Sequence, residues 1–452
     1  MKLDLLLRGG IVVGTTELHR VDVGVADGKI VAIDKTISGK FREEINAEAL
    51  HIFPGLIDSH VHFNEPGRAH WEGFETGSRA LAAGGGTMFF DMPLNAHPPT
   101  TDAESFDAKL SAAQKSSLTD FAFWGGLVPG NLNQLEGLSE RGVIGFKAFM
   151  SNSGIDDFSC VDDFTLREGM KRAAQFGKIV AVHAESESLT KKLTAERIAK
   201  NKISIRDYLD SRPVAAELEA IRRAIELAGE TSCALHVVHV SSGAGLAMIV
   251  EAKERGVNVS CETCPHYLAL TEDDIEKIGA VAKCAPPLRS TNEQEKLWQH
   301  FAAGNIDTIG SDHSPSPPEM KSNENFFKVW GGISGIQHTL PILISEAHVK
   351  RQIALPQIAK RISFNVAKRF SLPKTKGQIT IGADADFALV DLSQNFEIKK
   401  DDLFYRHPQS PYIGRSLHGK VVQTILRGQT IFRDGKILSQ PIGRLVKPQE
   451  NQ

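Results

Sequence analysis

The stretch that decides the fold is Gly142–Asn152, GVIGFKAFMSN, because it combines the pattern of a buried strand with a charged residue. Its apolar side chains predict a buried β-strand, yet Lys147 stands in the middle of the run. An ammonium group in apolar surroundings is costly unless it is paired, loses its proton or is chemically changed. The pattern therefore predicts a fold that buries this strand. It also means that the buried Lys147 requires a chemical explanation.

Short apolar runs alternate with amphipathic helical segments in both directions from this stretch. Helices are expected over residues 103–117, 166–177, 215–229 and 245–256, and several end at a glycine, as a helix C-terminus requires. Strand-like runs cover residues 56–62, 87–93, 120–128, 143–149, 178–185, 233–241, 257–263 and 306–313. Eight strands, mostly separated by helices, predict an α/β fold with a (β/α)8 TIM-like barrel over residues 54–372.

The two ends of the chain resemble each other and differ from the middle. Asp27-Gly28 and Asp434-Gly435 each separate two β-rich runs, which indicates hairpins. Neither end is long enough to bury its own apolar face. The sequence therefore predicts one small β-sandwich domain built from residues 1–53 and 373–452, in which residues 377–392 add strands.

Composition argues against several classes of partner. The 452 residues carry a formal net charge of −3 at pH 7 with no sustained basic tract, so we expect neither nucleic acid nor membrane as a partner. No apolar run approaches membrane-spanning length, and residues 1–14 lack the apolar core of a secretory signal. Five scattered cysteines fit a reducing compartment, so the expected location is cytoplasmic.

Polar side chains stand at the ends of five predicted strands, where a barrel carries its reactive groups. They are His60, His62, Lys147, His183, His239 and Asp312. Taken singly, a strand histidine is more often a hydrogen-bonded core residue, Asp312 could cap a helix, and Lys147 could extend to solvent. Six such placements at one barrel mouth together favour a metal site.

A metal site also gives Lys147 a role. A buried amine readily loses its proton, and the neutral form can add CO2 to become a carbamate. The carbamate is an anionic ligand with two oxygens that can bridge two cations about 3.5–4 Å apart. Nitrogen and oxygen ligands suit zinc, with cobalt, manganese or iron as alternatives. The hypothesis is two divalent metal ions per chain and CO2 held as a carbamate on Lys147.

Long motifs spread over nearly the whole chain resemble the cyclic amidohydrolases of the amidohydrolase superfamily. They are PGLIDSHVHFNEPGRAHWEGFETGSRALAAGGGT (54–87), DMPLN (91–95), GFKAF (145–149), CETCPHY (261–267), KCAPPLR (283–289), SDHSP (311–315) and WGGISGIQ (330–337). The resemblance implies that His60, His62 and Asp312 hold one metal. It implies that His183 and His239 hold the other, with carboxylated Lys147 bridging both, and that the enzyme is a homotetramer.

Two positions near the ligands distinguish the branches of this family. Dihydroorotases usually have an arginine where this chain has Asn64, and dihydropyrimidinases and hydantoinases usually have a tyrosine where it has Asn152. Both residues resemble the allantoinase pattern, which implies ring opening of allantoin to allantoate with Asp312 as the catalytic proton carrier. Hydantoinase chemistry is the alternative, followed by dihydroorotase chemistry and by a non-catalytic scaffold, which characteristically loses metal ligands.

Allantoin is uncharged and rich in donors and acceptors, so amides and main-chain groups are expected to bind it. The expected contacts are Asn64, Asn95, Asn152, Cys284, Ala285 and Gly331. Asn64 and Asn152 could equally be turn residues, and Cys284 a small buried apolar residue. His236 lies three residues from His239, so strand alternation predicts that it packs outside the barrel. Asp58 shares a strand face with the paired histidines and is expected to support them.

Overall fold

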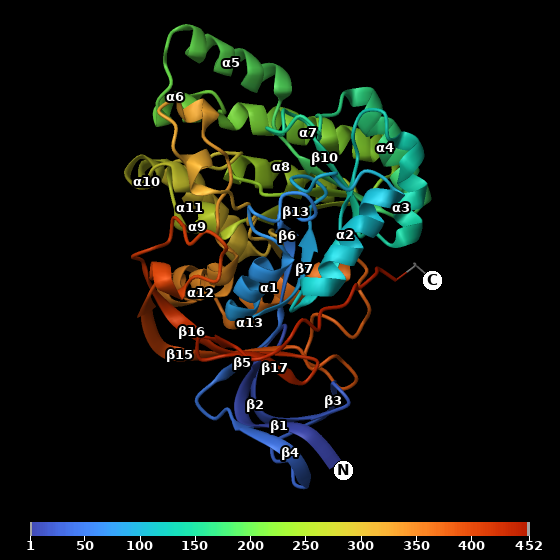
Figure 1. Cartoon of the computed structure of the whole chain (residues 1–452), viewed down its shortest axis with the longest axis vertical. Helices are drawn as coiled ribbons and strands as arrows, with labels where there is room; N and C mark the ends of the chain where they lie inside the picture. The colour runs from blue at the N-terminus through green and yellow to red at the C-terminus, as the bar shows by residue number, and fades with distance from the viewer. Residues whose placement is uncertain (1, 450–452) are drawn as a thin grey trace.

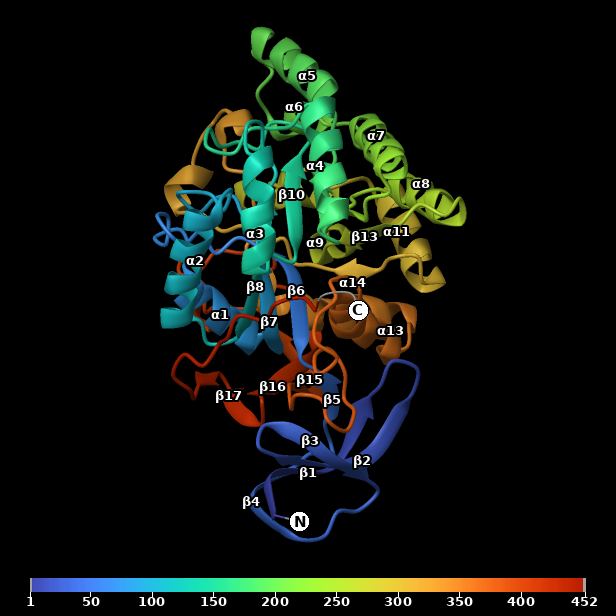
Figure 2. The ribbon, with the colours of Figure 1, turned by 90° about the vertical axis from the view of Figure 1, so that its right-hand side faces the viewer.

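The computed structural model describes residues 2–449, and its centre is a parallel barrel (Figures 1 and 2). The strands are β6 (Leu56–Val61), β7 (Gly86–Asp91), β8 (Asp120–Phe123), β9 (Gly125–Gly126), β10 (Gly145–Phe149), β11 (Ile179–His183), β12 (Leu235–Val237), β13 (Val259–Thr263) and β14 (Thr308–Ile309). β6–β7–β8 form one sheet and β9 to β14 another. The His62 amide donates to the His313 carbonyl at 2.8 Å, which joins the first strand to the last. Every predicted run contains a strand, and the predicted fold class is confirmed.

Helices surround the barrel in the predicted alternation. The longer ones are α1 (Phe74–Ala83), α2 (Ala103–Ser116), α3 (Leu135–Arg141), α4 (Asp163–Gln175), α7 (Val214–Thr231), α8 (Gly243–Glu254) and α11 (Thr291–Ala303), with the short α12 (Thr339–Leu343), α13 (Leu355–Ala359) and α14 (Asn365–Arg369) after the last strand. Gly177 and Gly256 follow α4 and α8 with positive φ, as expected. The prediction is wrong for Gly229, which lies inside α7, because the helix continues past it to Thr231 and the left-handed C-cap residue is Ser232.

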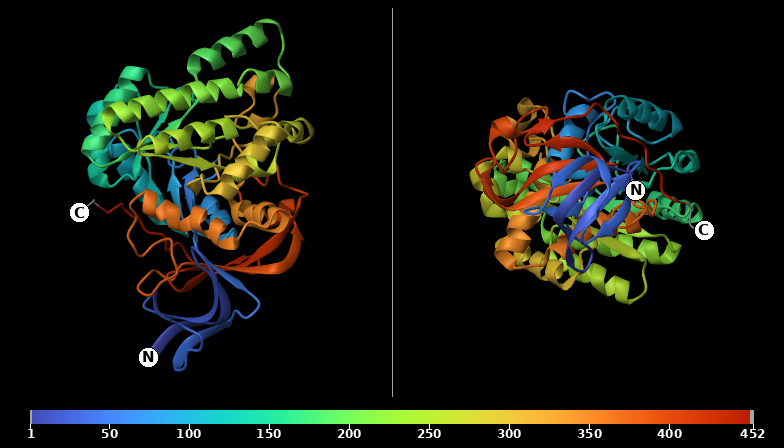
Figure 3. Two further views of the ribbon diagram at one scale, coloured as in Figure 1. Left: turned by 180° about the vertical axis from the view of Figure 1, so that it is seen from behind. Right: turned by 90° about the horizontal axis from the view of Figure 1, so that it is seen from below.

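Both ends of the chain form one nine-stranded sheet at the base of the barrel (Figures 1 and 3). Its strands are β1 (Lys2–Val13), β2 (Leu18–Ala26), β3 (Lys29–Asp34), β4 (Lys40–Asn46), β5 (His51–Pro54), β15 (Phe387–Glu397), β16 (Ser416–Leu426), β17 (Gln429–Arg433) and β18 (Lys436–Ile437). β5 lies between β1 and β15, so it joins the two halves. Side chains from both halves, among them Val23 and Phe387, share one core. The β-sandwich from both termini is confirmed, while the domain boundaries at 53/54 and 372/373 stay predictions.

Turn residues explain the hairpins of this sheet. Asp27 and Gly28 between β2 and β3, and Asp434 and Gly435 between β17 and β18, all have positive φ, as a two-residue hairpin turn requires. Both predicted hairpins are therefore confirmed. The expectation that residues 377–392 add strands is only partly right, because β15 begins at Phe387.

A buried ion cluster ties the sheet to the barrel. Lys376 contacts Asp120 at the start of β8 (2.7 Å), and also Asp384 (3.0 Å) and Asp386 (2.8 Å), just before β15. Arg427, in the turn between β16 and β17, binds the same Asp120. Residues from the barrel, the linker and the sheet thus meet around one carboxylate.

α5 (Glu187–Ala199) and α6 (Ile205–Asp210) project from the end of the barrel opposite the terminal sheet (Figures 1 and 2). Two further short helices, α9 (Pro265–Ala269) and α10 (Glu272–Ile278), follow β13. None of the helices within residues 2–449 has the length and apolar character needed to span a membrane.

Candidate active site

The end of β6 brings two imidazoles to the carboxylate that follows β14. His60 and His62 are two residues apart, so strand alternation places both on one face. Their Nε2 atoms lie 3.2 Å and 3.4 Å from the same oxygen, Oδ1 of Asp312. The ligand atoms of the three residues all lie within 4.8 Å of one another. Two nitrogens and an oxygen directed at one point form a set that suits a divalent metal.

A second pair of imidazoles meets beside the first. His183 ends β11, and His239 follows β12 with φ 40°, a left-handed conformation that breaks the strand alternation. Nδ1 of His183 lies 3.0 Å from Nε2 of His239. The ring of His239 lies 5.4 Å from that of His60 between centroids, so the two groups of ligands border each other.

Lys147 reaches the same place from β10 with its amine unpaired. The side chain is fully buried, and Nζ has no hydrogen-bond partner among residues 2–449. Burial lowers its pKa to about 8, although Asp312 and Glu262 act in the opposite direction. An unpartnered amine of lowered pKa beside two groups of ligand atoms fits the predicted carbamate site, and the residues present fit a metal centre.

Two buried carboxylates that sequence reasoning missed orient these histidines. Glu262 on β13 lies 2.8 Å from Nδ1 of His60, which directs Nε2 at Asp312. Glu185, two residues after His183, lies 2.8 Å from Nε2 of that ring, which directs Nδ1 at His239. Carboxylates in this position fix the tautomer and orientation of metal-binding histidines.

The two carboxylates remain ionised for different reasons. Burial opposes the charge of Glu185, but Arg212 and His183 outweigh it and lower its pKa to about 2. Burial likewise opposes the charge of Glu262, but His60 and His236 hold its pKa well below the usual range. Each carboxylate is therefore held in its ionised form by its own set of neighbours.

The prediction that His236 packs outside the barrel is wrong. Its Nδ1 lies 2.7 Å from Oγ of Ser260 and its Nε2 lies 3.9 Å from Glu262, which also contacts His60. Strand alternation places His236 inward, and the left-handed conformation of His239 turns that ring inward as well. Asp58 accepts hydrogen bonds from the amides of His60 (3.1 Å) and Ser311 (3.0 Å), so it supports the backbone of β6 and not a ring.

Asp312 leaves one of its two carboxylate oxygens without a hydrogen bond or ion pair within residues 2–449. Burial opposes its charge, but His60 and His62 outweigh it and lower the pKa of Asp312 to about 2. Both imidazoles contact Oδ1, and no hydrogen bond or ion pair within residues 2–449 uses Oδ2. The carboxylate therefore stays ionised with one oxygen available to a neighbouring group.

A cavity opens directly over these side chains. It is lined by His60, His62, Leu94, Asn95, Phe149, Asn152, Ser153, His183, His239, Cys284, Ala285, Asp312, Ser314, Trp330, Gly331 and Gly332. A wider outer chamber, lined in part by Thr190 and Ile198 of α5, shares Asn152 and Trp330 with it. The cavity therefore opens toward α5, away from the terminal sheet.

Five of the six expected substrate contacts line this cavity: Asn95, Asn152, Cys284, Ala285 and Gly331. Asn64 does not, and its amide donates to the Pro315 carbonyl at 3.4 Å. The side-chain oxygen of Asn152 accepts from the Gly154 amide at 2.8 Å, so it also has the turn role that the sequence left open. Burial raises the pKa of the Cys284 thiol to about 12, which keeps it neutral. Substrate contact stays a prediction for all six residues.

The sequence matches the amidohydrolase family over residues 51–431. It is 55% identical over 450 residues to an allantoinase from Rubrobacter xylanophilus, which covers 99% of this chain and 98% of that protein. It is 51% identical over 448 residues to an allantoinase from Deinococcus radiodurans, covering 99% of each chain.

Solved structures of the same kind superpose on nearly the whole molecule. L-hydantoinase (dihydropyrimidinase) from Arthrobacter aurescens matches with a TM-score of 0.96 and 33% identity, covering 98% of this chain and 100% of that one. Dihydropyrimidinase from Brevibacillus agri matches with a TM-score of 0.93 and 31% identity, covering 99% of each. The family implies a metal centre, and the cluster of His60, His62 and Asp312 provides ligands for one. The chain belongs to the amidohydrolase family.

Proposed function

We propose that this protein is a hydrolase that opens the ring of allantoin to give allantoate. The observation that carries the proposal is its similarity, over 99% of the chain, to proteins named allantoinase. The cavity supports it, because the residues within 2–449 that line it include no arginine or lysine, the side chains that would hold a carboxylated ring such as dihydroorotate. Amides, a neutral thiol and main-chain groups suit an uncharged, polar substrate.

The proposed cofactor is a pair of divalent metal ions, with zinc as the first candidate and cobalt, manganese or iron as alternatives. His60, His62 and Asp312 would hold one ion, and His183 and His239 the other. Lys147 would join the two as a carbamate, which accounts for its unpartnered amine. When bound, such a pair supplies a water of lowered pKa and polarises the scissile amide carbonyl.

The protein's own side chains would transfer the proton and orient the metal ligands. Oδ2 of Asp312 accepts a proton from the attacking water and returns it to the ring nitrogen that departs. Glu262 and Glu185 keep the rings of His60 and His183 in the orientation that directs one nitrogen of each at the centre. Lys147 carries no proton in this scheme.

The assembly and location of the enzyme are also proposed. All five cysteines are free thiols, which supports a reducing compartment such as the cytoplasm. The homotetramer rests on the family resemblance alone, and light scattering of the purified protein measures it. A tetramer gives a molar mass close to four times 49.3 kDa.

A parallel substrate assay tests the function. Purified enzyme reconstituted with zinc, cobalt or manganese is offered allantoin, hydantoin, dihydrouracil and dihydroorotate, and kcat/KM is compared. We expect the highest value for allantoin. The structural similarity to L-hydantoinase makes hydantoin hydrolysis the second candidate, and a higher kcat/KM for hydantoin would replace the proposal with it.

A further inference from the structure

One wall of the cavity is an irregular segment, Phe326–Gly332, of which Trp330, Gly331 and Gly332 line the cavity. Its only regular structure is one short 3-10 turn, η4 (Phe326–Lys328). Such a segment gains little order from its own backbone hydrogen bonds. Something else must fix the main chain that faces the substrate.

Lys321 binds the part of this segment nearest the cavity. Its Nζ donates to the carbonyls of Trp330 at 2.9 Å and Gly332 at 2.6 Å. The Trp330 amide in turn donates to the Met320 carbonyl at 2.9 Å, next to Lys321 in the chain. Both residues that flank Gly331 are therefore held by one ammonium group.

Lys283 binds the N-terminal half of the segment, residues 326–329. Its buried Nζ donates to the carbonyls of Phe326 at 2.7 Å and Val329 at 2.5 Å. The ammonium also lies 4.4 Å from the ring centroid of Tyr208 and 5.1 Å from that of Phe326, close enough for cation–π attraction. The Lys283 carbonyl accepts the Gly332 amide at 2.8 Å, so this residue contacts both ends of the segment.

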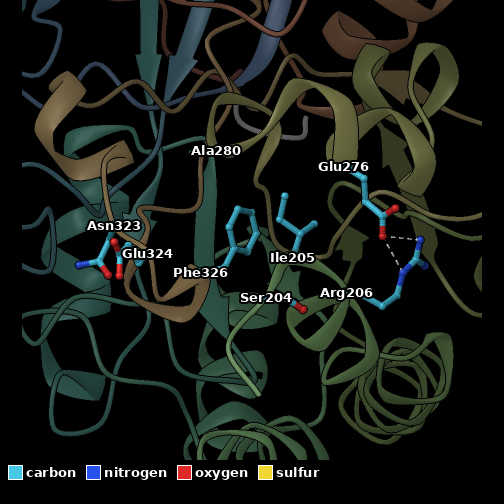
Figure 4. Close-up of a pocket in the computed structure, with 8 residues that line it drawn as sticks. All are labelled: Ser204, Ile205, Arg206, Glu276, Ala280, Asn323, Glu324 and Phe326. Carbon is cyan, nitrogen blue, oxygen red and sulfur yellow. Dashed lines mark hydrogen bonds and ion pairs between the residues drawn. The ribbon is translucent and has the colours of Figure 1, made fainter. Parts of the chain in front are cut away.

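The outer side of the segment is anchored by packing (Figure 4). Phe326 and Ile205 point into a surface pocket between the segment and α6, and the Phe326 amide donates to the Ile203 carbonyl at 2.9 Å. Arg206, at the edge of the pocket, is bound to Glu276 at 2.8 Å. This pocket lies behind the segment, and the cation at its edge, Arg206, is already paired.

We propose that Lys283 and Lys321 are positioning residues that fix the main chain of Trp330–Gly332 for substrate binding. The two ammonium groups bind the carbonyls of Phe326, Val329, Trp330 and Gly332, whereas no hydrogen bond within residues 2–449 uses the amide or carbonyl of Gly331. The Gly331 peptide groups therefore remain for the substrate. The substrate part of this proposal rests on the proposed function above.

The test compares Lys321→Met and Lys283→Met with Lys321→Arg, which keeps the donors, and with Lys328→Met, an exposed lysine of the same segment. Hydrogen exchange of the amides of residues 329–333 is measured without substrate, and KM, kcat and metal content are measured with allantoin. We expect both methionine variants to exchange these amides at least tenfold faster and to raise KM about tenfold. Metal content and kcat should stay within about twofold, Lys321→Arg should restore most of KM, and Lys328→Met should match the wild type.

The two readouts separate this proposal from the proposed function. Wild-type exchange rates in the segment of Lys321→Met would refute the clamp whether or not the enzyme opens allantoin. Faster exchange with an unchanged KM would refute the link to substrate binding. Lys321 is only partly buried, so its variants are expected to fold. They decide the question if Lys283→Met fails to fold. A wild-type enzyme inactive on allantoin overturns the function and leaves the exchange result standing.

Discussion

Lys147 poses the sharpest chemical question at the scale of single residues, because its buried amine has no hydrogen-bond partner among residues 2–449. We predict that Lys147→Ala abolishes activity and lowers the metal content from about two ions per chain to one or none. The bridging anion is lost in this variant while the histidines remain. Metal analysis of the purified variant beside the turnover of allantoin measures both effects.

Added short carboxylic acids provide the control for that variant. They fit the space left by the missing side chain and should restore part of the activity in the presence of metal. Lys109 is the matched position, since it is equally buried but is paired with Asp91 at 2.6 Å. Its replacement should lower stability without any response to added acids. Full activity of Lys147→Ala would exclude the carbamate.

Glu262 and Glu185 give a second prediction, because each orients the ring of one proposed metal ligand. Glu262→Gln and Glu185→Gln should each weaken metal binding about 10–100-fold, since an amide cannot hold the ring as an ionised carboxylate does. Competition with a coloured chelator measures the affinity. The exposed Glu324→Gln should bind metal like the wild type, and unchanged affinity in both buried variants would contradict the orienting role.

Sequence reasoning found the residues at the barrel mouth but not all of their partners. The six proposed ligands were marked by polar side chains at the ends of apolar runs. Glu262 carried a similar signal, a carboxylate inside the run 257–263, but nothing in the run states which ring it faces. Which nitrogen of His60 is free depends on contact between strands β6 and β13, which are about two hundred residues apart.

At the scale of elements, α7 contains a glycine that the fold does not need. Gly229 lies within the helix, and a Cβ there would meet nothing within 4 Å beyond the neighbouring backbone of the helix itself. We predict that Gly229→Ala stabilises the protein by about 1 kcal/mol, because alanine loses less backbone freedom on forming a helix. Chemical denaturation measures the change. Gly256→Ala is the matched control, and its φ of 86° should make that variant less stable than the wild type.

Gly310, directly after β14, is the opposite case, because the space beside it is already filled. A Cβ at Gly310 would lie 2.5 Å from Oε2 of Glu262, which is too close for any real contact. Gly310→Ala should therefore displace Glu262 from His60, weaken metal binding and lower the melting temperature. Calorimetry with and without zinc checks this, and a variant with wild-type metal affinity would show that the carboxylate adapts.

Local pattern predicted the elements well where packing agreed with periodicity. The apolar runs became strands, and the Asp-Gly pairs became hairpins. The pattern failed at His236, because the alternation of a strand holds only while the backbone stays extended. His239 has φ 40°, and no sequence signal marked the point where β12 gives way to that turn.

At the scale of the whole molecule, the buried ion cluster around Lys376 stabilises the fold, because it joins the barrel to the terminal sheet. Lys376→Met should cost about 3–5 kcal/mol, since it leaves Asp120 and Asp386 buried with less compensation. Urea denaturation measures the loss, and metal content of the folded protein should not change. Replacing the exposed Lys374 instead should have almost no effect on stability.

The pH dependence of that contribution has a definite sign. Burial lowers the pKa of Lys376, but Asp386, Asp120 and Asp384 outweigh it and raise this pKa above the ordinary value of 10.5. The stabilisation is therefore complete at neutral pH and is lost only at strongly alkaline pH. Wild type and Lys376→Met should converge in stability there, and a constant difference would point to packing alone.

The similarity of the two chain ends predicted that they form one domain. It did not predict the ion cluster that joins this domain to the barrel. Lys376, Asp120 and Arg427 look like scattered surface charges in the sequence. Only the folded chain brings them to one buried point, because the barrel strand β8 and the linker before β15 are far apart in the sequence. Long-range charge pairing of this kind has no local signature.

The position of β5 between β1 and β15 has a consequence for how the protein is made. During synthesis the first five strands leave the ribosome long before β15 to β18 are made. The edge of β5 that pairs with β15 therefore stays unpaired during that time. Over that interval the N-terminal segment is a candidate for chaperone binding, and a stalled or truncated chain would expose that edge to its neighbours. Only the arrival of the final strands closes it.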